Sequence, residues 1–289
     1  MSKPNPLQGF FRKPKFSITL PSRGKWYPKN TLDSTDGTVD VYAMTAADDT
    51  RFKTNEVLIS HLATYDLIRS CIPQIKDPES VPVVDLDAII LSVRRASYGN
   101  SMDFTSPVPN TDLKQVIQLD VEKLINSLGN AQELWDDQLI IHDGDLQLTI
   151  TLAPLPLRSM FTTTRQLMKQ QQQSAKLNNS DQDIDEKITD MDSQLKNLSS
   201  LSINMTVDSI KNISIPDVYS SDRPSDIRQF VSQLDLEYFR AIQTHLEAQK
   251  KKISFLPIDC TSTAEQITAG APETWQANIS FSTTNFFAA

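Results

Sequence analysis

The chain has 289 residues, a formal net charge of −8 and a pI of about 4.9, with 39% apolar and 22% charged residues. The acidic balance argues against a surface that grips nucleic-acid phosphates, and seven scattered glycines cannot build a phosphate-binding loop. Two distant cysteines exclude a disulfide framework, and no apolar run reaches the about 18 residues that a membrane span needs.

The pattern predicts an α+β fold, with a small mixed α/β body of short strands and two buried helices, plus a long two-helix, coiled-coil-like extension. Residues 1–15 are rich in proline and basic residues, and they predict an N-terminal arm that is ordered only where it docks. The start of the chain has no apolar stretch, so we expect no secretion signal and synthesis in a reducing cytoplasm.

The α+β body is expected over residues 16–157. Its first strands are predicted at residues 16–20 and 39–42, and its two buried helices at residues 57–72 and 83–96. Gly99 lies where a left-handed helix cap would fall.

Two further strands in the body are predicted on either side of a tight turn. Residues 138–142 and 145–152 flank Asp143-Gly144, a dipeptide typical of a two-residue hairpin turn. Two prolines after this hairpin end the body.

A long helical extension is predicted over residues 158–252. Its apolar residues from position 184 recur at steps of 4, 3, 4 and 3, the spacing of a coiled-coil seam: Ile184, Ile188, Met191, Leu195 and Leu198. Residues 201–213 alternate like a strand, residues 214–226 predict a linker, and a second helix is expected over residues 225–252.

The two long helices can pair with each other or with a partner chain, and the linker is long enough for either arrangement. We expect an intramolecular hairpin that projects from the body. The last segment, residues 253–289, is expected to carry strands that return to the N-terminal sheet of the body.

Side chains that carry chemistry are isolated in this sequence. The histidines, at positions 61, 142 and 245, lack zinc-ligand spacing, and we expect His61 to be buried on an apolar helix face. The carboxylate pairs at positions 85/87, 136/137 and 143/145 fit a first helical turn, a strand approach and a hairpin turn. Residues 181–185 mimic a calcium loop but continue into Glu186, where that loop needs glycine. We therefore expect no catalytic residue, no metal site and no cofactor.

A set of motifs in the first hundred residues carries a resemblance. The segment from Phe16 to Tyr27 (FSITLPSRGKWY) is followed by AMT at residues 43–45, DD at 48–49, SCI at 70–72, DLD at 85–87 and RRASYGN at 94–100. Cys260, Trp275 and the NFF at residues 285–287 add weaker support. This pattern resembles the baseplate hub subunit family of T4-like contractile-tailed bacteriophages.

The resemblance implies a structural virion component that assembles with other hub and wedge proteins at the tail tip, in the cytoplasm of the infected host. Members of the family often carry cysteine pairs, but residues 106–110 (SPVPN) contain none and Cys260 has no near partner. A metal clip is therefore not expected here. We expect no nucleic-acid partner and no membrane span, and a homo-oligomer is possible.

Candidate interface residues follow from the resemblance and from the seam: Arg94, Arg95, Tyr98, Ile184, Ile188, Met191, Leu195, Leu198, Phe286 and Phe287. Arg94 and Arg95 either anchor a partner carboxylate or make local salt bridges. Three functions compete at this point: a structural hub subunit, a hub assembly chaperone that leaves before the virion matures, and a tail-associated hydrolase that uses one of the carboxylate pairs.

Overall fold

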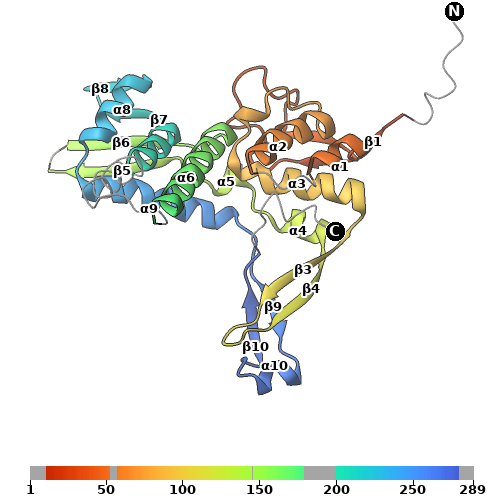
Figure 1. Ribbon diagram of the computed structural model, residues 1–289. Helices are drawn as coiled ribbons and strands as arrows, with labels where there is room; N and C mark the ends of the chain where they lie inside the picture. The colour runs from red at the N-terminus through yellow and green to blue at the C-terminus, as the bar shows by residue number, and fades with distance from the viewer. Residues whose placement is uncertain (1–10, 53–56, 145, 179–198, 280–289) are drawn as a thin grey trace, which may run out of the picture.

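The computed structural model describes residues 11–52, 57–144, 146–178 and 199–279 (Figure 1). Small antiparallel sheets and helices occur together, which confirms the α+β class. The strands are β1 (Pro14–Thr19), β2 (Thr38–Tyr42), β3 (Ser101–Pro107), β4 (Lys114–Asp120), β5 (Gln138–Asp143), β6 (Leu146–Leu152), β7 (Ile210–Ile215), β8 (Tyr219–Ser221), β9 (Ile258–Thr261) and β10 (Thr274–Ala277). The helices are α1 (Ala46–Phe52), α2 (Val57–Cys71), η2 (Pro78–Ser80), α3 (Val83–Tyr98), α4 (Val121–Ser127), α5 (Ala131–Leu134), α6 (Leu157–Asn178), α8 (Pro224–Gln233), α9 (Leu236–Ile253) and α10 (Ala264–Thr268).

The first core lies between the β1–β2 sheet and helices α2 and α3. Ile18, Val39 and Val41 face this core from the sheet, and nine residues of α3 are buried. The two buried helices of the body are thus as predicted. The arm is shorter than predicted because β1 already begins at Pro14, inside residues 1–15.

A second core lies behind a four-stranded antiparallel sheet with the order β5-β6-β7-β8. The predicted tight hairpin is present, with Asp143 opposite Leu146 and Gly144 at a φ of +58°. Helix α9 packs its apolar side chains, including Ile242 and Leu246, into this core.

This second core corrects the predicted helical extension. Residues 199–209 are helical, so the strand expected over residues 201–213 is present only from Ile210. The expected linker over residues 214–226 contains β8, which forms a hairpin with β7. The expected single helix over residues 225–252 is interrupted at Leu234 and Asp235, between α8 and α9. Because β6 and β7 offer an apolar sheet face, α8 and α9 pack their apolar side chains against it. The seam of the predicted hairpin lies outside the described residues.

The C-terminal strands also differ from the prediction. Within the described residues β9 and β10 pair only with each other, and they do not join the β1–β2 sheet. They pack beside the β3–β4 hairpin through a small third core of Val108, Cys260, Ala271, Trp275 and Ala277. The two hairpins lie side by side and project away from the rest of the body (Figure 1).

Candidate functional site

The turn that follows β1 is fixed by a buried carboxylate. The backbone N–H of Ser22 donates to Oδ1 of Asp85 at 2.7 Å, and its hydroxyl donates to Oδ2 at 2.5 Å. The N–H of Gly24 donates to the Ser22 hydroxyl at 3.1 Å. Arg23 and Gly24 both have positive φ, of +48° and +81°, so the turn depends on this anchor and on glycine.

Burial controls the titration of this anchor. Burial raises the pKa of Asp85 to about 6, although the two hydrogen bonds from Ser22 oppose the shift. Burial and the negative charge of Asp85 together raise the pKa of Tyr27 well above its ordinary value. Both carboxylate oxygens of Asp85 are occupied by Ser22, so this carboxylate holds the chain in place.

A second node joins β2, α1 and α2. Asp48 accepts hydrogen bonds from the N–H and the hydroxyl of Thr45, at 2.8 and 2.7 Å, and from the hydroxyl of Ser70 at 2.9 Å. Arg12 donates to the carbonyls of Ala43 and Ser70, so this part of the arm docks on the body. Burial alone would raise the pKa of Asp48, but the bonds from Thr45 and Ser70 and the charge of Arg12 hold it below its ordinary value.

The end of α3 is a third node. The hydroxyl of Ser97 accepts from the N–H of Met44 at 2.9 Å and donates to the carbonyl of Val93 at 2.7 Å. The Tyr98 hydroxyl donates to Asp49. Gly99 has a φ of +94° and its N–H bonds to the carbonyl of Arg95, which confirms that glycine ends this helix.

The two candidate arginines have different surroundings. Arg95 pairs with Glu122 at 2.8 Å and lies over the ring of Phe16 at 4.5 Å, which is the local salt bridge that the sequence allowed. Arg94 is only 9% exposed, lies 5.4 Å from the Tyr98 ring centroid, and has its pKa lowered by burial. Tyr98 is 41% exposed, so a partner can still reach it. The interface role of these three residues stays a prediction.

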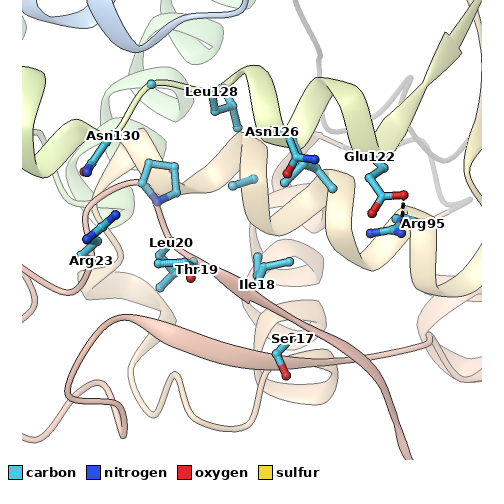
Figure 2. A pocket seen from close by; sticks show the side chains of 14 residues that line it. Ser17, Ile18, Thr19, Leu20, Arg23, Arg95, Glu122, Asn126, Leu128 and Asn130 are labelled. Carbon is cyan, nitrogen blue, oxygen red and sulfur yellow. Dashed lines mark ion pairs between the residues drawn. The ribbon is translucent and has the colours of Figure 1, made fainter.

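A groove of about 450 Å³ lies between the outer edge of β1 and helix α4 (Figure 2). Consecutive residues 17–21 form one side, and Glu122, Ile125 and Asn126 of α4 form the other. Arg23 and Asn130 lie close together at one end, and the Arg95–Glu122 pair marks the other end (Figure 2). Sequence reasoning missed this groove, because nothing in a strand pattern shows which edge of the strand stays unpaired.

The three histidines that the sequence offered as candidates make no arrangement typical of a catalytic or metal site in the described structure. His61 is buried as predicted and stacks on Phe161 at 4.3 Å, and burial together with the charge of Arg165 lowers its pKa. His142 is exposed, and Nε2 of His245 lies 2.9 Å from the carbonyl oxygen of Asp136. In the part of the chain that the structure describes, no group of three or more His, Cys, Asp or Glu side chains could hold a metal ion.

Several predictions fall on undescribed residues. The seam of Ile184, Ile188, Met191, Leu195 and Leu198 lies outside the described residues, as do Phe286 and Phe287 and the calcium-like segment 181–185. None of the described helices is long and apolar enough to cross a bilayer.

Comparison with known proteins gives a family. A sequence profile of the family described as T4 bacteriophage base plate protein matches residues 13–270, which is well over half of the chain. No curated protein and no solved structure matched.

Proposed function

The chain belongs to the T4 bacteriophage base plate protein family, and on that premise we propose that it is a hub subunit of the tail baseplate, held there by protein–protein interfaces. Family membership makes it a structural component of the virion's tail baseplate. The hub position within the baseplate is the proposal.

The observation that supports the hub position is that both motifs shared with hub subunits hold the ends of helix α3. The LPSRG segment is anchored at the start of α3 through Asp85, and the SYG segment closes the other end of α3 through Ser97 and Met44. These two motifs, which carry the resemblance to hub subunits, therefore clamp the same helix from both ends. The clamp is assembled from residues far apart in the sequence, as expected if the chain shares the framework of that family.

We further propose that the protein works without a reactive centre. Three members of the candidate carboxylate pairs have structural partners: Asp85 accepts from Ser22 through both oxygens, Asp137 pairs with Lys25 at 3.0 Å, and Asp136 accepts from the N–H of Gln138 at 3.2 Å. These contacts support a structural role for the three carboxylates.

Mass spectrometry of purified tails, together with isolated hub and wedge subassemblies, tests the hub position. We expect the chain in finished tails and in the hub subassembly, and we expect none in free wedges. Recovery only with wedges would contradict the hub position. Complexes with hub precursors but none with finished tails would establish the assembly chaperone instead.

Assays of peptidoglycan hydrolysis test the proposal that the protein has no catalytic centre. The wild-type chain, Asp136→Asn and Asp143→Asn should all give the background rate. Turnover by the wild-type chain that either substitution abolishes would show an enzyme.

A further inference from the structure

The outer edge of β1 is unpaired within the described residues, since β1 pairs with β2 alone. The register places Ile18 opposite Val39, and the N–H of Leu20 continues the ladder to the carbonyl of Gly37 at 3.0 Å. Because hydrogen-bonded and non-hydrogen-bonded pairs alternate in an antiparallel ladder, Ile18 and Leu20 direct their backbone groups toward β2. Ser17 and Thr19 therefore direct their N–H and C=O groups away from β2, toward the groove.

Side-chain contacts across the two strands agree with this alternation. The Ser17 hydroxyl donates to Asp40 at 2.6 Å, and the Thr19 and Thr38 hydroxyls lie 3.2 Å apart. Side chains approach most closely in non-hydrogen-bonded pairs. The backbone groups of Ser17 and Thr19 are thus donors and acceptors without a strand partner among the described residues.

The groove gives these groups room for a partner strand. Proteins usually cover or shorten an open sheet edge, because such an edge recruits other strands. Here α4 lies alongside the outer edge of β1, and a groove of about 450 Å³ separates the two elements (Figure 2). Ile125 and Leu128 line the side of the groove opposite β1. An extended segment can pair with β1 on one side and contact these apolar side chains on the other.

The ends of the groove indicate the chemistry of the segment. Arg23 is exposed at one end, and among the described residues no carboxylate pairs with it. Asn130, on the opposite wall, has a buried Oδ1 without a hydrogen-bond donor in the described structure. A segment with a carboxylate near Arg23 would give this guanidinium a partner, and a shift of the Asn130 side chain would let its Oδ1 accept an N–H of the same segment.

A second copy of the chain fits this groove poorly. An antiparallel pairing of two β1 strands would bring Lys13 and Lys15 of one copy toward Arg23 of the other. Like charges facing each other across strands are destabilising. A β1–β1 dimer at this edge is therefore disfavoured, and a segment of another protein is the occupant that we infer.

The geometry points to the outer edge of β1 as the docking site for an extended, acidic segment of another baseplate protein, which adds to the sheet as a third strand. This inference rests on the proposed function, because it takes the partner from the same baseplate. It goes beyond that function by naming the surface and the chemistry of the partner.

Overlapping synthetic peptides that cover the other baseplate proteins of the same phage provide the probe, with the purified full-length chain as the receptor. We expect binding to peptides that combine β-forming residues with Asp or Glu. Thr19→Pro removes an outward N–H and should weaken binding about tenfold or more, whereas Thr19→Ala keeps that N–H and should bind normally. Arg23→Glu should also weaken binding, and Lys29→Glu, the same charge change outside the groove lining, should not.

Amide hydrogen exchange on the wild-type chain gives a readout that needs no variant. The amides of Ser17 and Thr19 should exchange more slowly with the peptide bound, and those of Ile18 and Leu20 should change little. Peptide binding without protection of Ser17 and Thr19 would overturn the inference, as would equal binding by Thr19→Pro and Thr19→Ala.

Three other outcomes separate this inference from the proposed function. If sedimentation shows a dimer of the chain that Thr19→Pro dissociates, the edge serves a second copy and the inference is wrong. If the chain is present in the hub but no peptide binds at the edge, the inference fails while the proposed function stands. If the chain is absent from tails, the proposed function fails whatever the peptides show.

Discussion

Ser22 and Asp85 are 63 positions apart, and both the N–H and the hydroxyl of Ser22 donate to the Asp85 carboxylate. The serine belongs to the turn after β1, and the aspartate lies in the first turn of α3. One fully buried carboxylate thus ties the small sheet to the central helix of the first core. Removing the Asp85 carboxylate should therefore destabilise the packing of the β1–β2 sheet on α3.

Asp85→Ala should destabilise the protein by about 2–3 kcal/mol, because the buried N–H and hydroxyl of Ser22 lose their acceptors. Asp85→Asn keeps one acceptor oxygen and should cost about 1 kcal/mol. Urea unfolding followed by circular dichroism measures both changes. Equal stability of the wild-type chain and Asp85→Ala would show that the anchor contributes nothing.

Asp87 should make stability depend on pH, with a sign opposite to that of a salt-bridged carboxylate. Burial raises its folded pKa to about 6, whereas an unfolded aspartate titrates near about 3.9. Between these values the folded state holds more protons, so stability rises as the pH falls from about 6 toward 4, by at most about 1.4 kcal/mol per pH unit. His61, whose pKa is lowered by burial, acts in the opposite direction, so total stability is not the readout.

The readout for Asp87 is the difference between Asp87→Asn and the wild-type chain. The neutral amide carries no buried charge, so its stabilising effect should be largest at pH 7 and should shrink as the pH approaches 4. Urea unfolding at several pH values measures this difference. A difference that is the same at every pH would contradict the raised pKa.

Gly99 and Gly144 should respond differently to substitution, although neither is crowded by neighbouring atoms. Gly99 has a φ of +94° and a ψ of −175°, a conformation that essentially only glycine adopts, so Gly99→Ala should cost about 1–3 kcal/mol. Gly144 has a φ of +58°, in the left-handed region that asparagine tolerates, so Gly144→Asn should cost little. Thermal unfolding of both variants tests this contrast, and equal losses would contradict it.

Helix α9 offers a matched pair for testing the second core. Ile242 is fully buried against the sheet, and Leu236, on the same helix, is 61% exposed. Ile242→Ala should cost about 2–5 kcal/mol, whereas Leu236→Ala should change stability by less than about 0.5 kcal/mol. If the two variants unfold at the same urea concentration, α9 does not pack as described.

The elements that sequence reasoning placed correctly have local signals. Helices α2 and α3 have apolar spacing of the helical period, Gly99 ends α3, and a glycine turn links β5 and β6. The fold class and the burial of His61 followed from the same kind of pattern.

The elements that were wrong depend on distant partners. Residues 201–209 alternate in hydrophobicity yet form a helix, because only one side of that segment, including Val207, reaches the second core. β7 pairs with β6 across some sixty residues of intervening chain, and no local pattern specifies such a partner. The groove beside β1 is likewise invisible in the sequence, since Ser17 and Thr19 would look the same in a covered strand.

The junction between β6 and β7 has a consequence for how this protein can change in length. Leu152 lies opposite Ile210, and the N–H of Ala153 donates to the carbonyl of Ser209 at 2.8 Å, so the intervening chain departs and comes back at neighbouring points. Because both ends of this segment are held by the pairing of β6 with β7, we expect an insertion inside it to add mainly a loop-closure cost, about 0.6 kcal/mol for each doubling of length by the flexible-chain rule. Such an insertion should leave the register of β6 and β7, and the apolar side chains packed behind them, in place.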